Sequence, residues 1–277
     1  MNSCPICNGT IFEPTKIGFT QLHHCTTCNV HVLEKLPQQE ELESYYSAEY
    51  IMSEAETLAS EHRRIFRMPE QYWLVSQLEK YGLSNGATIL DIGCDKGYFI
   101  DHARRFGYQV QGVEPSHSAR AYCEKAGIQV YASMNEIDGK FDAITMWHVL
   151  EHFTNPQGLI SECANKLRTD GLLFIRVPDF ESRWSKLLRS YWIWFQPKNH
   201  YIHYSKSSLT MLVEQHGFET IKCMSRKPNN SITFKAGLLA DNMLRKHFKY
   251  GQSFKKILGR LYEHFTGVEI YLIARKK

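Results

Sequence analysis

The chain has 277 residues, a formal net charge of +4, 43% hydrophobic residues and 22% charged residues. This length and composition predict one α/β domain with a small accessory unit in a soluble, cytoplasmic protein. No apolar run approaches the ~18 residues of a membrane-spanning helix, and the N-terminus lacks the basic and apolar stretches of a secretory signal.

Two Cys-x-x-Cys pairs stand near the N-terminus, in "CPICN" and "CTTCN". Four thiolates at this spacing are typical ligands of a structural Zn²⁺ ion, and about 37 residues need such an ion because they cannot bury a self-sufficient core. Two disulfides, or a ligand role for His23 or His24, are the alternatives, and a cytoplasmic location disfavours the disulfides. We therefore predict a zinc ribbon over residues 1–37 with the ligands Cys4, Cys7, Cys25 and Cys28.

The composition changes after the ribbon. Residues 38–61 contain seven Glu and no Lys or Arg, which indicates a helical linker. The pattern of residues 62–81 predicts a helix that is closed by Gly82 and the turn "SNG". Residues 38–83 are thus expected to form a helical linker or lid.

Strand and helix patterns alternate from Ala87 onward. This rhythm is typical of βαβ units and a parallel sheet. It predicts an α/β domain over residues 84–277, with strands near 87–92, 109–113, 128–131, 141–146 and 171–177.

The first of these strands leads into the turn "ILDIGCDKGYFI", which is typical of nucleotide-binding sites. A nicotinamide dinucleotide fingerprint is excluded, because Asp95 and Tyr98 replace its second and third glycines. What remains is Asp91 at the strand end and Glu114 at the end of the next strand, where an acid can hold the ribose hydroxyls of an adenosine. A helix-capping role is the alternative for Glu114. The sequence therefore predicts a ligand with a ribose but no pyrophosphate.

Several stretches together resemble the class I S-adenosylmethionine-dependent methyltransferases. They are "ILDIGCDKG", "VEP", "FDAITMWHVLEHFTNP" and "LRTDGLLFIRVPD", and "SKSSLTMLVEQHGFE" extends the likeness to about residue 224. The N-terminal "CPICN…CTTCNVHVLEKLP" followed by "YYSAEY" is similar to the zinc-ribbon methyltransferases of bacterial surface-polysaccharide gene clusters.

The resemblance implies a Rossmann-like, doubly wound, seven-stranded sheet. Its last strand, "VEIYLIARKK", would be antiparallel, with insertions near 179–204 and 225–266. S-adenosylmethionine would lie across the carboxyl ends of the first strands. Asp95 departs from the family's small residue, and because Asp tolerates positive φ we expect weaker or shifted binding rather than none. The cofactor-binding residues implied are Asp91, Gly93, Cys94, Asp95, Gly97, Glu114 and Asn135.

Histidines near the expected crevice are candidates for the general base that a hydroxyl acceptor needs. His148 follows the fourth strand and His200 lies on the loop after the fifth, so these two are the first choice for the catalytic role. His152 and His203 are the second choice. A structural role is the alternative for each of them, and Glu151 is expected to orient or cap.

Two further segments bear on the acceptor. Residues 183–195 combine five aromatic with three basic side chains, which suits a stacking platform, a membrane contact, a dimer interface or plain packing. From Lys222 to the C-terminus, thirteen Lys and Arg oppose three acidic residues, so this tail carries +10 and the rest of the chain −6. This charge favours an anionic partner, with a solvated basic face as the alternative.

These features predict a methyltransferase that acts on a sugar or glycan intermediate of bacterial polysaccharide biosynthesis, with O-methylation favoured. The acceptor is expected to be anionic because it is linked to a nucleotide or lipid diphosphate. Contact of the protein with a membrane surface is a further possibility. Nucleic acid is disfavoured because Lys16 is the only Lys or Arg before Cys28. The alternatives are an RNA methyltransferase that uses the ribbon and the basic tail, and a non-catalytic scaffold.

Overall fold

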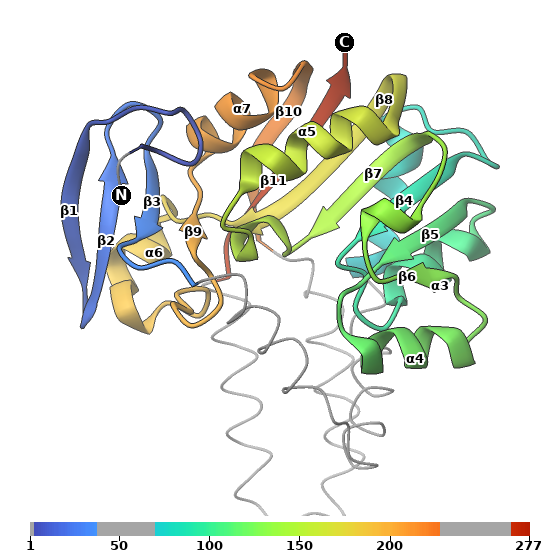
Figure 1. The fold of residues 1–277 in the computed structure, drawn as a ribbon, viewed down its shortest axis with the longest axis horizontal. Coiled ribbons are helices and arrows are strands. Elements are labelled where there is room, and N and C mark those ends of the chain that lie inside the picture. Colours follow the sequence, from blue (N-terminus) through green and yellow to red (C-terminus); the bar gives the residue numbers. More distant parts are fainter. Residues whose placement is uncertain (1–2, 38–69, 228–266) are drawn as a thin grey trace, which may run out of the picture.

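The structure is a computed structural model that describes residues 3–37, 70–227 and 267–277. These residues form a seven-stranded sheet flanked by a smaller four-stranded sheet (Figure 1). The large sheet has the order β10-β11-β8-β7-β4-β5-β6. Its strands are β4 (Thr88–Ile92), β5 (Gln109–Val113), β6 (Val130–Tyr131), β7 (Phe141–Trp147), β8 (Leu167–Pro178), β10 (Phe218–Arg226) and β11 (Glu269–Lys276).

The strand pairing confirms the predicted fold class. Strands β6, β5, β4, β7 and β8 are parallel, and β11 pairs antiparallel with both β8 and β10. All five strands predicted from the alternating pattern are present, and the apolar runs of β4, β7 and β8 are buried on both faces of the sheet, whereas β6 is a half-buried edge strand.

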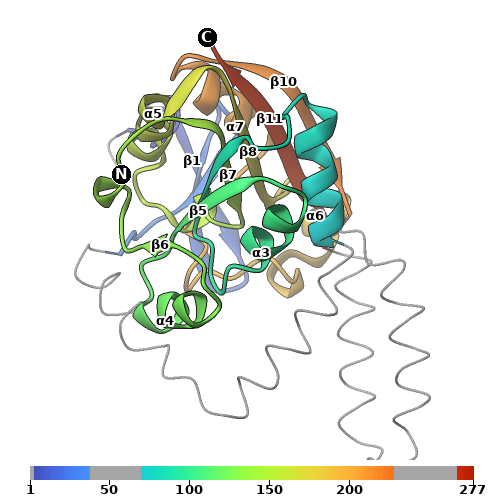
Figure 2. The same ribbon diagram turned by 90° about the vertical axis from the view of Figure 1, so that its right-hand side faces the viewer.

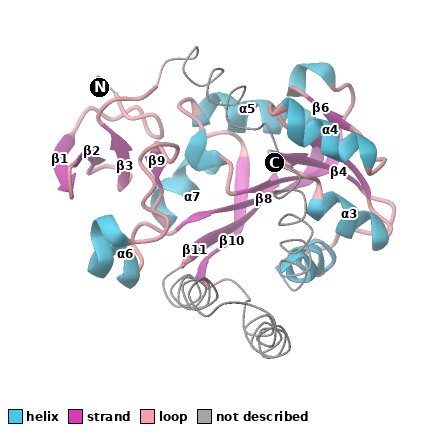
Figure 3. Ribbon diagram, turned by 90° about the horizontal axis from the view of Figure 1, so that it is seen from below, coloured by secondary structure: helices cyan, strands magenta, loops and turns pink. Residues whose placement is uncertain are grey.

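Helices cover both faces of this sheet, as Figures 2 and 3 show. Alternate strand residues point to opposite sides, so Leu90 and Ile144 pack in the same core as α5 (Pro156–Lys166) and α7 (Lys206–Glu214). Ile89 and Ala143 belong to the other core. That core contains the helix over residues 70–80, α3 (Tyr98–Arg105) and α4 (His117–Lys125).

The N-terminal unit is a ribbon of three antiparallel strands, β1 (Phe12–Ile17), β2 (Thr20–Cys25) and β3 (Val30–Leu33). A fourth strand, β9 (Ile202–His203), comes from the main domain and pairs with β3. The backbone N–H of Leu33 also donates to the carbonyl of Tyr201 (3.0 Å). The ribbon sheet is therefore completed by the loop that follows β8 in the chain.

Parts of two predicted segments fall outside the described residues. They are residues 38–69 of the linker and residues 228–266 of the basic tail. The described residues 70–80 are helical, within the predicted helix. The division of the chain at residues 37 and 83 stays a prediction. None of the helices in the described ranges combines the length and apolar character needed to cross a membrane.

Candidate functional site

The turn after β4 is held in a left-handed backbone conformation at three residues. Gly93, Asp95 and Gly97 have φ of 67°, 48° and 69°. A Cβ on Gly93 would lie 2.5 Å from the Val149 side chain, and one on Gly97 would lie 2.8 Å from Ile128. Space and positive φ therefore both favour glycine at Gly93, whereas at Gly97 the positive φ is the main reason because the Ile128 methyl group can shift, and Asp is tolerated between them.

Glu114 ties this turn to the end of β5. Its carboxylate accepts hydrogen bonds from the backbone N–H of Asp95 (3.0 Å) and from that of Ser116 (2.9 Å), the N-cap residue of α4. Burial raises the pKa of this carboxyl. A carboxylate has about four acceptor sites, so these two bonds leave capacity for ribose hydroxyls. Glu114 thus has an organising role of its own, and its ribose role stays a prediction.

The other predicted cofactor-binding residues lie at the same edge of the sheet. Asp91 is buried at the end of β4 and accepts a hydrogen bond from Thr145 Oγ1 (2.6 Å), while burial raises its pKa to about 7. Asn135 is exposed in the 3-10 helix η1 (Met134–Glu136) that follows β6. The Cys94 thiol instead packs against Gly112, where an added Cβ would lie 2.6 Å from its sulfur. Only the backbone of Cys94 is therefore available to a ligand at the turn.

His148 is clamped between two carboxylates. Its Nδ1 lies 3.1 Å from Glu151 Oε1 and its Nε2 lies 2.8 Å from Glu269 Oε1, while its ring stacks on Trp194. Ionised carboxylates only accept, so both ring nitrogens carry hydrogen. Burial alone would lower the pKa of His148, but the charge of Glu269 and the two hydrogen bonds hold it above its usual value. The imidazolium has no free lone pair in this arrangement.

His152 and His200 have the opposite arrangement. The Nδ1 of His152 lies 2.8 Å from the carbonyl oxygen of Asn199, and the Nδ1 of His200 lies 2.8 Å from that of Trp194. A carbonyl only accepts, so each Nδ1 carries a hydrogen and the lone pair of the neutral ring is on Nε2. Burial lowers the pKa of His200 to about 4. The geometry therefore favours these two residues over His148 as groups that can accept a proton or bind an ion.

His203 lies in the core of the molecule. It is part of β9, and its ring stacks on Phe180 and Phe195 at centroid distances of 4.7 and 5.3 Å. Burial lowers its pKa to about 3. These contacts favour a packing role.

The structure contains an ionic network next to His148 that was not predicted from the sequence. Arg176 Nη1 lies 3.0 Å from Glu70 Oε1, which also accepts a hydrogen bond from Tyr271 Oη (2.6 Å). The same hydroxyl lies 3.2 Å from Glu269. These residues come from the helix at 70–80, β8 and β11, so no local pattern joins them. The sequence feature that could have indicated the network is a single charged residue in each of two apolar strands, Arg176 in "LLFIRVP" and Glu269 in "VEIYLI".

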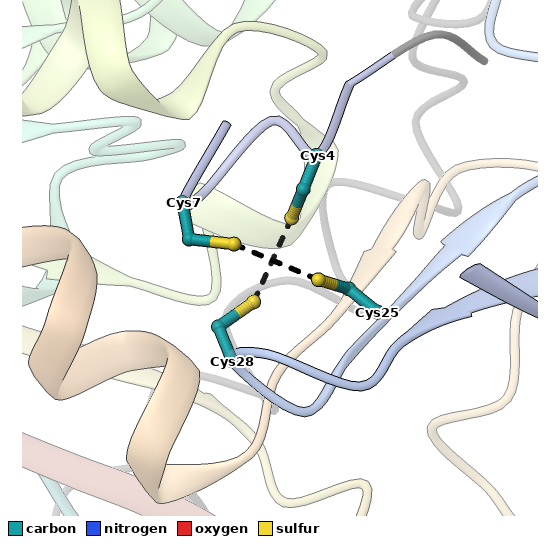
Figure 4. A group of neighbouring side chains, drawn as sticks. All are labelled: Cys4, Cys7, Cys25 and Cys28. Atoms are coloured by element: carbon teal, nitrogen blue, oxygen red, sulfur yellow. Dashed lines mark hydrogen bonds between the residues drawn. The ribbon is translucent and has the colours of Figure 1, made fainter. Parts of the chain in front are cut away.

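The four N-terminal cysteine sulfurs converge, as Figure 4 shows. Cys4 and Cys28, and likewise Cys7 and Cys25, have sulfurs 3.6 Å apart, and all four lie within 4.8 Å of one another. A disulfide needs about 2.05 Å. Sulfurs about 2.3 Å from one Zn²⁺ ion in a tetrahedral site lie about 3.8 Å apart, so the set can hold zinc. His24 is engaged elsewhere, with its Nε2 2.8 Å from Asn29 Oδ1.

The aromatic insertion is mostly packed. Trp192 and Phe195 are buried in the core shared with the ribbon, and Trp194 covers His148. The segment contains α6 (Arg183–Leu188), and Arg189 Nη2 donates to the Lys16 carbonyl oxygen of the ribbon (2.9 Å). Packing therefore accounts for the rings of Trp192, Trp194 and Phe195.

Comparison with known proteins identifies the family of the chain and solved structures that have a similar fold. A family model described as a methyltransferase domain matches residues 62–222. A ubiquinone biosynthesis O-methyltransferase of Xanthomonas axonopodis pv. citri is 32% identical over 101 residues, covering 32% of this chain and 42% of the relative. The matched region thus spans less than half the length of this curated relative.

Two solved structures share the fold. One is a Burkholderia thailandensis 1,6-didemethyltoxoflavin-N1-methyltransferase with bound 1,6-didemethyltoxoflavin and S-adenosylhomocysteine (TM-score 0.55, 14% identity, 96% of this chain and 99% of that one). The other is a mycolic acid cyclopropane synthase (TM-score 0.54, 17% identity, 75% of this chain and 84% of that one).

Proposed function

Because the chain belongs to the methyltransferase-domain family, we propose that it transfers a methyl group from S-adenosylmethionine to a small-molecule acceptor. The observation that carries this proposal is the turn after β4. Its three left-handed residues and its bond to Glu114 form a rigid edge at the carboxyl ends of β4 and β5. Doubly wound sheets bind ligands at this edge.

The residues at this edge fit the cofactor. S-adenosylmethionine, when bound, supplies an electrophilic methyl group on a sulfonium. Gly97 is the N-cap of α3 and makes no side-chain capping bond, so N–H groups of the first helical turn are available to the cofactor's carboxylate. In this proposal Asp95 would accept from the ammonium group, and Glu114 and Asn135 would hold the ribose and the adenine.

A hydroxyl acceptor is favoured. The curated relative is named as an O-methyltransferase. Transfer to a hydroxyl forms a C–O bond, breaks the C–S bond and releases one proton. Among the described residues of this region, His152 Nε2 or His200 Nε2 can accept this proton when no metal ion occupies them, whereas His148 has no free lone pair. The imidazolium of His148 and its carboxylates instead hold the loop after β7 in place.

The narrower proposal is a sugar or glycan acceptor that carries a phosphate. The positive charge of residues 222–277 and the ribbon resemblance support it. An RNA acceptor has less support, because the ribbon carries a single Lys or Arg before Cys28. The proposed zinc is structural, since four cysteine ligands close its coordination shell.

Calorimetry with S-adenosylhomocysteine tests the cofactor site. We expect 1:1 binding by the wild type, and a loss of about 1.5 to 3 kcal/mol with Glu114→Ala because charge-assisted hydrogen bonds are removed. Glu124→Ala is the matched control, since that carboxylate is exposed on α4. Absence of binding by the folded wild type would overturn the proposal. Equal affinity of wild type and Glu114→Ala would move the ribose site elsewhere.

A further inference from the structure

Three metal-ligating side chains meet where the loop after β7 touches the loop before β9. They are Glu151, His152 and His200, and one possible ligand atom from each lies within 4.8 Å of the other two. A hydrogen bond from the Tyr201 N–H to the Glu151 carbonyl oxygen (2.8 Å) joins the two loops. Val149, two residues before Glu151, packs on Gly93 of the cofactor turn. The chain segment that carries Glu151 and His152 therefore also contacts the cofactor turn, through Val149.

In both histidines it is the Nε2 atom that makes no hydrogen bond to the residues that the structure describes. Backbone carbonyls accept from the Nδ1 of His152 and of His200, which fixes the tautomer and directs the Nε2 lone pairs away from those carbonyls. A second hydrogen bond of this kind is the usual support of a metal-ligating histidine. The neutral ring is also the form that binds a metal.

Glu151 adds an anionic oxygen without a donor. His148 engages Oε1, while Oε2 is buried and has no hydrogen-bond partner among the residues that the structure describes. An uncompensated buried carboxylate oxygen is costly.

The three free atoms are all acceptors. A cation satisfies all three. Two imidazoles and one carboxylate are a common set for divalent transition metals, and they leave coordination positions open. Ligand atoms about 2.1 Å from one ion lie about 3 to 3.4 Å apart, so a small inward rotation completes the site.

We propose that Glu151 Oε2, His152 Nε2 and His200 Nε2 bind one divalent transition-metal ion, and that this ion binds the acceptor hydroxyl. The second part rests on the proposed function. The bound hydroxyl becomes more acidic and loses its proton to water. Its oxygen then bonds to the methyl carbon, and the electron pair of the broken C–S bond stays on sulfur. No oxidation or reduction takes place.

Cobalt titration of the full-length protein, after dialysis against EDTA, tests the first part. Co²⁺ bound by nitrogen and oxygen shows weak visible d–d bands, whereas Co²⁺ in the four-cysteine site shows a strong thiolate charge-transfer band. We expect wild type to bind one Co²⁺ without thiolate ligands, and His200→Gln to weaken this binding at least about 100-fold. His216→Gln is the control, because its Nδ1 also bonds to a backbone carbonyl, that of Leu212.

A replacement variant and two further measurements can each refute the proposal. If Glu151→Gln or His200→Gln fails to fold, His152→Gln replaces the less buried ligand and should show the same loss. Equal Co²⁺ affinity in wild type and a folded ligand variant would overturn the site. Activity that survives full removal of the ion would overturn its role in catalysis. S-adenosylhomocysteine binding, measured on the same samples, reports separately on the methyltransferase proposal.

Discussion

Replacing His148 with Asn tests whether the buried imidazolium holds the two carboxylates together. His148 has φ of 58°, and Asn is among the residues that best tolerate this region. The change therefore removes the positive charge and the ring with little added backbone strain. Glu151 and Glu269, both nearly fully buried, would then lack the cation between them.

The expected loss is large for a single substitution. Removing one partner of a buried ion pair costs about 3 to 5 kcal/mol, and the lost stacking on Trp194 adds about 0.5 to 1.5 kcal/mol. The Asn amide can donate to one carboxylate and recover about 1 kcal/mol. We therefore expect a loss of about 3 kcal/mol or more in the free energy of unfolding near pH 6.

The pH dependence has a definite sign. The folded-state pKa of His148 is raised, so its charge stabilises the fold fully below the unfolded-state pKa of about 6.5. That contribution falls as the pH rises through the folded-state value. The difference between wild type and His148→Asn should thus be largest near pH 6 and shrink in alkaline solution.

Urea denaturation at constant zinc concentration measures both effects. In a Glu269→Gln background, the loss caused by His148→Asn should fall by at least about 1 kcal/mol, because one of the two carboxylates no longer needs the cation. A loss below about 1 kcal/mol at pH 6, or one that does not change with pH, would refute the argument.

Two other predictions concern the ribbon and the cofactor turn. Elemental analysis should find that Cys28→Ser carries one zinc per chain less than the wild type, and the variant should have a lower melting temperature; equal zinc contents in the two proteins would refute the four-cysteine site. Gly97→Ala should reduce stability by about 1 to 3 kcal/mol, because φ is positive and the added Cβ meets Ile128 at 2.8 Å. The free energy of unfolding of Asp95→Gly should stay within about 1 kcal/mol of the wild-type value, because relief of the positive φ offsets the entropy that glycine adds to the unfolded chain. Equal losses of stability in Gly97→Ala and Asp95→Gly would contradict the argument.

Features that depend on residues close together in the chain could be predicted from the sequence alone. The five parallel strands follow from short apolar runs between helical patterns, and the observed strands β4 to β8 confirm them. The cysteine cluster follows from two local pairs, Cys4 with Cys7 and Cys25 with Cys28, and the structure brings all four together. Asp95 could be expected at positive φ because its neighbours Gly93 and Gly97 mark a tight turn.

The arrangement around the histidines was decided by tertiary structure. His148 meets Glu269 across 121 residues, and His152 and His200 are oriented by carbonyls of residues 199 and 194. Pairing of β3 with β9 joins the ribbon to the loop that carries His200. A sequence pattern shows which residue types are present and how they are spaced. The protonation state and the free lone pair of each histidine depend on partners that only the packed chain supplies.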